Sequence, residues 1–247
     1  MNVLGYIEGK RKGGPLHFTL IDPDKQEPGR AGMLAERAKS AGSDAIMVGG
    51  TWGDAYGEKL NGTVGKIKKA GLPVISFPNS AQQLSPDADA VFFMSLLNSR
   101  STQYIIEEQM KGSLIIQKYG IEPLPMAYII VESGAATSAA WAGDVKPIPR
   151  DKPEFAVGYA LAAKYFGMKF IYLEAGSGAK ETVPKEMIAA VKQAVGSGVF
   201  VIVGGGIRDA GTAREKTGAG ADIIVTGTIA EEDPAAFAEI VRAIKGK

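Results

Sequence analysis

The chain has 247 residues, and its 28 Lys and Arg against 27 Asp and Glu leave a formal net charge of +1. This balance excludes the basic footprint of a nucleic-acid-binding protein. The absence of cysteine excludes disulfides, thiolate catalysis and iron–sulfur clusters, and the single histidine, His17, excludes a multi-histidine metal site. The N-terminus lacks the apolar stretch of a signal peptide, and no run approaches the ~18 apolar residues of a membrane span. We therefore expect a cytoplasmic protein with no membrane span.

Short apolar runs alternate with helical patterns along the chain. Runs rich in Val, Ile or Phe are typical of strands buried on both faces of a parallel sheet, and Pro184 and Pro234 suit the first turn of a helix. In chain order, we expect a strand at 17–21, a helix at 29–41, a strand at 45–48, a helix at 58–70, a strand at 73–77, one helical turn at 80–84, a strand at 90–94, a helix at 102–119, a strand at 126–131, a helix at 152–166, a strand at 170–173, a helix at 184–195, a strand at 200–203, a helix at 211–217, a strand at 223–225 and a helix at 234–245.

Eight strands alternating with helices predict an α/β fold, either a closed parallel barrel or a long open sheet. A length of about 250 residues favours the (β/α)8 TIM barrel, which we expect as one domain over residues 1–247. Segments 41–50 (AGSDAIMVGG) and 219–228 (AGADIIVTGT) are similar, through an internal repeat or through convergence on a common turn before a strand. The long irregular stretch 132–151 is expected at the barrel mouth, as a lid or tunnel wall.

Glycine-rich loops follow the last two strands. Gly204, Gly205 and Gly206 end the seventh strand, and Gly227 and Thr228 end the eighth. The active sites of such barrels lie at the C-terminal strand ends, and the loops after strands seven and eight are a recurrent phosphate site. Glycine lets backbone N–H groups approach an anion closely. We interpret the two loops as a phosphate nest; the alternative is a pair of ordinary tight turns.

The sixth strand ends in YLEAGSG, from Tyr172 to Gly178. Tyr172 and Glu174 are two residues apart, so their side chains face the same side of the strand. If that side is the barrel interior, a carboxylate and a phenol meet a substrate beside the phosphate nest, which Ser177 and Gly178 extend. The alternative for Glu174 is a buried ion pair.

Paired carboxylates follow the first strand. Asp22 and Asp24 flank a proline, and Thr51 offers a hydroxyl at the end of the second strand. Carboxylate oxygens suit Mg²⁺, which keeps water or substrate phosphates as its other ligands. The alternative is a turn that Asp24 caps, while Lys25 either offsets diphosphate charge or is a solvated turn residue. His17 lies five residues before Asp22, so its side chain faces the opposite side of the strand. We expect His17 to have a structural role.

Together these motifs resemble a known family. HFTLIDPDK (17–25), MVGGT (47–51), YLEAGSGA (172–179), VGGGIR (203–208) and TGT (226–228) are similar to geranylgeranylglyceryl phosphate synthase, the archaeal prenyltransferase family of ether-lipid synthesis. The resemblance spans essentially the whole barrel. It implies Mg²⁺-dependent transfer of a geranylgeranyl group from geranylgeranyl diphosphate to the sn-3 hydroxyl of sn-glycerol 1-phosphate, with release of diphosphate.

The resemblance also implies roles for individual residues. Asp22 and Thr51 would hold Mg²⁺, and Glu174 would act as the catalytic residue by hydrogen-bonding the attacking hydroxyl. The substrate-binding residues would be Tyr172, Leu173, Glu174, Ala175, Gly176, Ser177, Gly178, Gly204, Gly205, Gly206, Gly227 and Thr228.

Prenyl chain length and assembly stay open at this point. A bacterial relative with similar motifs uses a longer, heptaprenyl donor, and the small residues at 134–140 with the bulk of Trp141 are candidate determinants of chain length. Trp141 is equally a candidate contact with a neighbouring subunit. The family includes dimers and hexamers, and we expect a homo-oligomer. Competing hypotheses are a sugar-phosphate isomerase or cyclase barrel, which shares the phosphate nest, and a non-catalytic phosphometabolite sensor.

Overall fold

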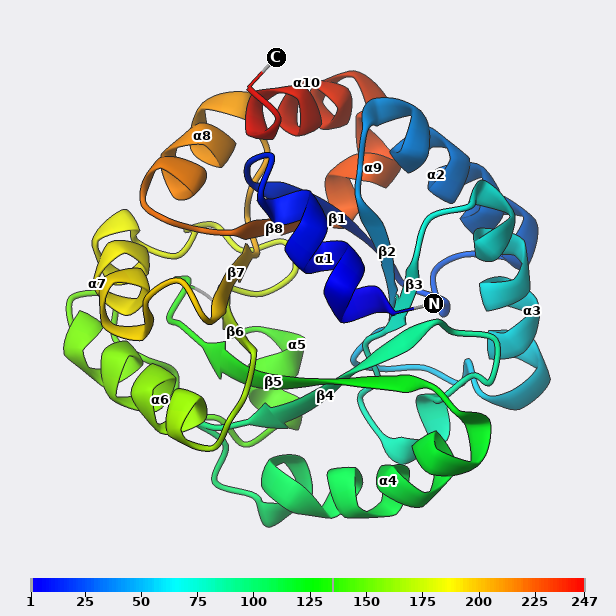
Figure 1. Ribbon diagram of the computed structural model, residues 1–247, viewed down its shortest axis with the longest axis horizontal. Coiled ribbons are helices and arrows are strands. Elements are labelled where there is room, and N and C mark those ends of the chain that lie inside the picture. Colours follow the sequence, from blue (N-terminus) through cyan, green and yellow to red (C-terminus); the bar gives the residue numbers. More distant parts are fainter. Residues whose placement is uncertain (1, 135, 247) are drawn as a thin grey trace.

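The computed structural model describes residues 2–134 and 136–246, which form a closed barrel of eight parallel strands (Figure 1). Each strand pairs with the next along the chain, and β8 pairs with β1. The expected (β/α)8 TIM barrel is confirmed. The strands are β1 (Leu16–Ile21), β2 (Ala45–Val48), β3 (Val74–Ser76), β4 (Ala90–Leu96), β5 (Glu122–Ile130), β6 (Phe170–Glu174), β7 (Phe200–Gly204) and β8 (Ile223–Thr226).

Helices surround the barrel and cover one of its ends (Figure 1). They are α1 (Val3–Arg11), α2 (Pro28–Ala41), α3 (Gly57–Ile67), α4 (Glu108–Tyr119), α5 (Ser138–Ala142), α6 (Pro153–Tyr165), α7 (Lys185–Val195), α8 (Ala210–Gly218), α9 (Thr228–Glu232) and α10 (Pro234–Ile244), with the short turns η1 (Lys68–Ala70), η2 (Ala81–Gln83) and the π-helical turn η3 (Gln103–Glu107). None of the helices in the described part of the chain is both long and apolar enough to cross a bilayer.

Three helices, α1, α5 and α9, were not expected from the sequence, and α5 lies within the stretch expected to be irregular. Strand β5 begins at Glu122, four residues before its expected start. Pro123 and Pro125 argue against a strand because proline donates no ladder hydrogen bond. The Pro125 carbonyl accepts the backbone N–H of Lys169, so the peptide groups of both prolines point towards β6, with which β5 pairs only from Met126 onwards. The unpaired side of β5 therefore tolerates the missing donors.

Large apolar side chains fill the barrel interior, and α1 closes its N-terminal end. Phe18, Met47 and Phe92 are fully buried inside the barrel. Helix α1 lies across the barrel end (Figure 1), and its Val3 and Ile7 are fully buried against these interior residues. The carboxylate of Glu122, at the start of β5, accepts the backbone N–H of Leu4 at 3.0 Å and thereby satisfies a free donor of the first helical turn.

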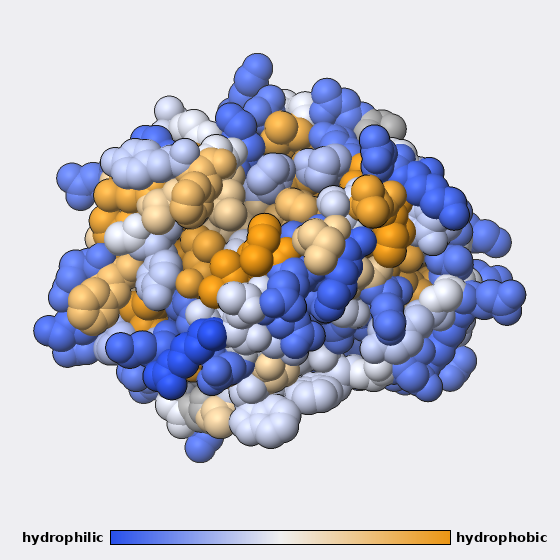
Figure 2. Space-filling view, turned by 90° about the horizontal axis from the view of Figure 1, so that it is seen from below, coloured by the Kyte–Doolittle hydropathy of each residue, from blue (hydrophilic) through white to orange (hydrophobic). Residues whose placement is uncertain are grey.

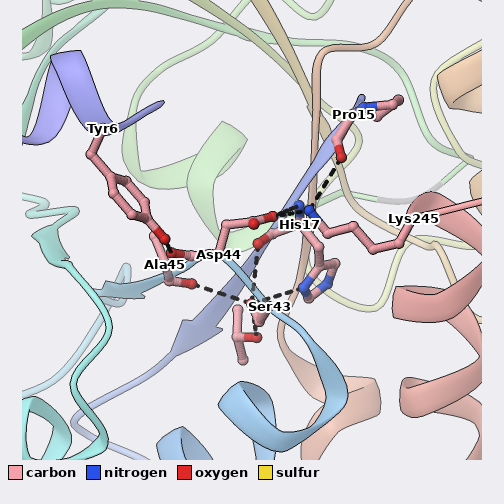
Figure 3. A network of polar contacts seen from close by, with 8 residues as sticks. Tyr6, Pro15, His17, Ser43, Asp44, Ala45 and Lys245 are labelled. Carbon is pink, nitrogen blue, oxygen red and sulfur yellow. Dashed lines mark hydrogen bonds and ion pairs between the residues drawn. The ribbon is translucent and has the colours of Figure 1, made fainter. Parts of the chain in front are cut away.

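Three aspartates at the N-terminal strand ends repeat one arrangement. Asp44, Asp89 and Asp222 each precede a strand and accept the backbone N–H of a residue in the preceding strand, at 2.9, 2.9 and 2.8 Å. Asp44 and Asp222 belong to the two similar segments noted in the sequence, which therefore occupy equivalent βα units. Asp44 also joins a buried polar network around His17 (Figure 3). These contacts place stabilising polar groups at the barrel end opposite the glycine loops.

Candidate active site

A cavity of about 580 Å³ occupies the C-terminal end of the barrel and continues over the outer face of β4. The loops after β2, β6, β7 and β8 form its mouth. Of the residues singled out in the sequence, the cavity is lined by Thr51, Tyr172, Glu174, Gly176, Ser177, Gly178, Gly205, Gly206, Gly227 and Thr228. Leu173 and Ala175 instead pack in the apolar layer between the barrel and its helices, as strand alternation requires.

Glu174 is the buried carboxylate of this site. Its Oε1 accepts the backbone N–H of Gly176 at 2.5 Å, and the hydroxyl of Tyr172 donates to the same carboxylate. Burial raises the pKa of Glu174, while these two hydrogen bonds oppose the rise. Burial and the charge of Glu174 hold the pKa of Tyr172 well above its ordinary value, so the phenol stays a donor. The carboxylate is thus fixed in place and poised to accept a proton.

The glycines after β7 allow this cluster to exist. A Cβ on Gly204 would lie 2.2 Å from the hydroxyl oxygen of Tyr172, and one on Gly205 would lie 2.6 Å from Oε1 of Glu174. Gly205 also has a φ of +88°, a conformation that glycine adopts without strain. Gly204 therefore allows β7 to pack closely against the Tyr172 side chain of β6, whereas Gly205 and Gly206 line the cavity.

Two loops that were expected to share a phosphate do lie together. The hydroxyl oxygens of Ser177 and Thr228 are 3.5 Å apart, which brings the loop after β6 against the loop after β8. Arg208 also lines the cavity and donates from Nη2 to the carbonyl of Gly178 at 3.2 Å. Arg208 was not among the site residues expected from the sequence, although a cation two residues after the glycine run was a signal for it.

Asp22 and Thr51 lie at neighbouring strand ends. A Cβ on Gly50 would lie 2.5 Å from Oδ1 of Asp22, so the backbone before Thr51 passes directly over this carboxylate. Asp22 Oδ1 accepts the backbone N–H of Asp24 at 3.0 Å, and Lys25 Nζ lies 3.7 Å from Oδ2. Burial raises the pKa of Asp22, and the Asp24 N–H and Lys25 oppose the rise.

This donor set fits Mg²⁺ better than a transition metal. Among the described residues no cluster of three His, Cys, Asp or Glu side chains could enclose a metal. Mg²⁺ binds through one or two carboxylates and keeps waters or substrate phosphates, so one carboxylate with a neighbouring hydroxyl is a sufficient protein contribution. Asp22 and Thr51 therefore remain the candidate ligands.

Asp24 has a different role from Asp22. Its Oδ1 accepts the backbone N–H groups of Asp54 and Ala55, both at 2.8 Å. Gly53, at a φ of +140°, lies so close that a Cβ would come within 1.9 Å of the Asp24 carboxyl carbon. Asp24 therefore anchors the loop between β2 and α3, whereas its own turn is closed by Asp22, which accepts the Asp24 N–H.

The apolar half of the cavity begins at an aromatic wall. The rings of Phe77, Tyr128 and Tyr172 contact one another, with centroids 5.2 to 5.8 Å apart. Beyond this wall the cavity continues as an apolar groove on the outer face of β4. The described segment between β3 and β4 holds only the single turn η2, so no full helix covers this part of the barrel. The residues lining the groove are Leu84, Val91, Phe93, Tyr104, Gly112 and Ile116.

The sequence suggests residues 134–140 and Trp141 as candidate determinants of prenyl chain length. Ser138 and Ala139 of α5 do line the cavity, whereas residue 135 lies outside the described residues. Trp141 is 74% exposed and packs against Trp52, with ring centroids 5.7 Å apart. The groove beside η2 was missed, although the short turn expected at 80–84 was the signal for it.

Comparison with known proteins identifies the family. The PcrB family model matches residues 7–245. The chain is 55% identical over 225 residues to the geranylgeranylglyceryl phosphate synthase of Methanothrix thermoacetophila, covering 91% of this chain and 87% of the relative. It is 55% identical over 236 residues to the enzyme of the same name from Methanosarcina acetivorans, covering 94% of each.

A solved structure shows the same similarity in three dimensions. The chain matches (S)-3-O-geranylgeranylglyceryl phosphate synthase from Thermoplasma acidophilum, crystallised in complex with its substrate sn-glycerol-1-phosphate, with a TM-score of 0.94 and 42% identity over 100% of both chains. The resemblance noted in the sequence is confirmed over almost the entire chain. This chain therefore belongs to the PcrB family, and its relatives carry the name geranylgeranylglyceryl phosphate synthase.

Proposed function

We propose that this enzyme transfers a geranylgeranyl group from geranylgeranyl diphosphate to the sn-3 hydroxyl of sn-glycerol 1-phosphate and releases diphosphate. One observation carries the proposal: a single cavity joins a glycine-lined polar end, at Glu174, to a long apolar groove over β4. A phosphorylated acceptor and an apolar donor chain require two such unlike ends. The Thermoplasma relative with bound sn-glycerol-1-phosphate supports this substrate for the polar end.

The polar end would hold the glycerol phosphate. Gly205 and Gly206 line it with backbone that has positive φ, and the hydroxyls of Ser177 and Thr228 approach each other from two loops. Backbone N–H groups in such a conformation form an anion-binding concavity. The guanidinium of Arg208 adds a fixed positive charge at the same rim. The phosphate would therefore bind without a metal ion.

Glu174 would take the proton of the attacking hydroxyl. In the reaction a bond forms between the glycerol oxygen and C1 of the prenyl group, and the bond from C1 to the diphosphate oxygen breaks. The hydroxyl proton passes to the Glu174 carboxylate, which burial makes more basic than an exposed one. A carboxylate accepts about four hydrogen bonds, so Gly176 and Tyr172 leave capacity for the substrate.

Asp22 and Thr51 would hold Mg²⁺ at the diphosphate side of the cavity. When bound, the ion supplies positive charge that stabilises the leaving diphosphate. Lys25 lies beside Asp22 and is 58% exposed on its side chain, so it is available to the same anion. The chain's own contribution is to keep this carboxylate half-buried and oriented by the Asp24 N–H.

The groove over β4 would hold the prenyl chain. The name shared by the relatives supports a geranylgeranyl donor, and the heptaprenyl donor is the alternative. Leu84, Gly112 and Ile116 line the part of the groove beside α4. A longer chain would have to extend past the side chains of Leu84 and Ile116.

We also propose that the enzyme is a cytoplasmic homo-oligomer, a dimer or a hexamer. Several large apolar side chains stand exposed outside the cavity, a feature typical of protein interfaces. Trp141 is 74% exposed, and Phe155, Tyr165 and Phe166 on or beside α6 are 52%, 79% and 76% exposed. A loop tryptophan is the kind of residue that anchors a subunit contact.

The decisive test mixes the purified enzyme with sn-glycerol 1-phosphate and radiolabelled prenyl diphosphates of increasing length, with and without Mg²⁺. We expect lipid-soluble product and free diphosphate with the C20 donor, only when Mg²⁺ is present. The enantiomer sn-glycerol 3-phosphate is the matched control. Absence of product from every donor would refute the proposal, and maximal turnover with a C35 donor would favour the heptaprenyl alternative.

A further inference from the structure

Helix α4 and the π-helical turn before it carry an apolar stripe on their outer surface. Ile106, Met110 and Leu114 recur at every fourth residue, and they are 58%, 60% and 71% exposed. Residues at this spacing lie on one face of a helix. Figure 2 looks onto the side of the barrel that carries α4 and shows apolar residues gathered in its middle. We call these three residues the α4 stripe.

The opposite side of the same helix lines the apolar groove. Gln109, Gly112 and Ile116 line the cavity, and none of the α4 stripe does. A Cβ on Gly112 would lie 3.6 Å from Leu84, so α4 packs closely against the chain after η2. One helix therefore stands between the proposed site of the prenyl chain and the exposed stripe.

We infer that the α4 stripe docks the enzyme onto the surface of a lipid bilayer. The inference rests on the proposed function, because a C20 prenyl donor and its product are lipids that partition into a bilayer. Docking through α4 would bring the groove beside the bilayer, so that the apolar chain need not cross water. An amphipathic helix lying in the interface buries its apolar face in the headgroup region in this way.

The size of the stripe favours a bilayer over a second copy of the chain. A standard protein interface buries ~800 Å² on each partner, far more than three partly exposed side chains supply. The exposed polar neighbours on this helix are of both signs, with Glu107 and Lys111 beside the stripe and Lys118 beyond it. Lys111 is also paired with Glu108 at 2.9 Å. Docking should therefore depend on insertion of apolar side chains and not on anionic lipid.

Vesicle flotation tests the inference. The full chain is mixed with vesicles of phosphatidylcholine alone, or with one quarter phosphatidylglycerol, at low and high salt. We expect the wild type to float with both kinds, with little dependence on salt. The triple variant Ile106→Gln, Met110→Gln, Leu114→Gln should lose about tenfold or more of its vesicle partition, because its apolar anchors are removed.

A matched pair of single variants controls for a general effect of polarity. Met110→Gln and Met33→Gln make the same change at similar exposure, 60% and 65%, but Met33 lies on α2, away from α4 (Figure 1). We expect Met110→Gln to weaken flotation and Met33→Gln to leave it unchanged. Equal flotation of the triple variant and the wild type would overturn the inference. So would binding to anionic vesicles alone, or a loss of particle mass in the triple variant, which would identify a protein interface.

Activity measurements separate this inference from the proposed function. With donor dispersed in detergent, the triple variant and the wild type should turn over equally, since the stripe does not line the cavity. With donor embedded in vesicles, the variant should be slower. If the wild type makes no product in either form, the proposed function fails, while flotation still decides whether α4 docks on lipid.

Discussion

At the scale of single residues, Glu174 combines burial with a fixed geometry. Its side chain faces the cavity with Tyr172, as the spacing of the two residues predicts, and the Gly176 N–H holds one of its oxygens. Glu174→Gln keeps a carbonyl oxygen for that N–H but removes the proton acceptor. We expect kcat to fall about 10²–10⁴-fold, with the KM for sn-glycerol 1-phosphate changed only a few-fold.

Steady-state kinetics across pH, together with binding of sn-glycerol 1-phosphate, would check this prediction. Glu181→Gln is the matched control, because it makes the same change at a carboxylate that is 53% exposed on its side chain and pairs with Arg150. It should leave kcat unchanged. Full activity in Glu174→Gln would assign the proton transfer to another group and leave Glu174 with a packing role.

At the scale of elements, the sequence predicts every strand because buried parallel strands read as continuous apolar runs, and the chain length favours the closed barrel over an open sheet. Helix α1 escapes prediction because its burial depends on the barrel end that it covers, and only Val3 and Ile7 are buried along it. The groove over β4 escapes for a related reason. It results from a helix that is missing between β3 and β4; the sequence predicts the single turn there, but the groove itself depends on how α4 packs beside the uncovered strand.

Strand β7 meets β6 at a position where only glycine fits. Gly204→Ala would place a methyl group 2.2 Å from the Tyr172 hydroxyl oxygen and 3.0 Å from Glu174 Oε2. Overpacking of this kind costs about 1–3 kcal/mol, and it should also push the phenol away from the carboxylate and lower kcat. Gly158→Ala is the matched control, since nothing lies within 4 Å of its Cβ on the outer side of α6.

Urea unfolding of the two variants would measure the difference. Alanine is favoured over glycine within a helix by about 1 kcal/mol, so Gly158→Ala should be slightly more stable than the wild type, whereas Gly204→Ala should be less stable. An equal free energy of unfolding for Gly204→Ala and the wild type would mean that β6 and β7 move apart to accommodate the methyl group without loss of stability. The close packing inferred at this strand end would then be wrong.

At the scale of the whole molecule, a buried network ties the first strand to the last helix (Figure 3). His17 is completely buried, and its ring nitrogens lie 3.0 Å from the Ser43 hydroxyl and 2.9 Å from the Thr226 hydroxyl. Its backbone N–H is held by Asp44, which forms an ion pair with Lys245 just after α10. The single histidine therefore ties β1 to β8 from behind the cavity wall, where it contacts Thr226 without lining the cavity itself.

This network makes stability depend on pH. Burial, with a smaller effect of Lys245, lowers the pKa of His17 from 6.5 to about 3. Below pH 6.5 the unfolded chain binds a proton that the folded chain refuses, so stability falls as the pH drops from 6.5 towards 3. The slope approaches about 1.4 kcal/mol per pH unit, which amounts to about 2 kcal/mol lost between pH 7 and pH 5.

Urea unfolding of the wild type and His17→Gln over this pH range isolates the effect. The raised pKa values of Asp22, Glu174 and Glu231 act in the opposite direction, because these folded carboxyls bind protons more readily than unfolded ones. They are present in both proteins and cancel in the difference. We expect the variant to be less stable at pH 7 but to lose the slope that His17 contributes between pH 6.5 and 5. An unchanged slope would mean that His17 is protonated in the folded chain, with the network rearranged to hold its charge.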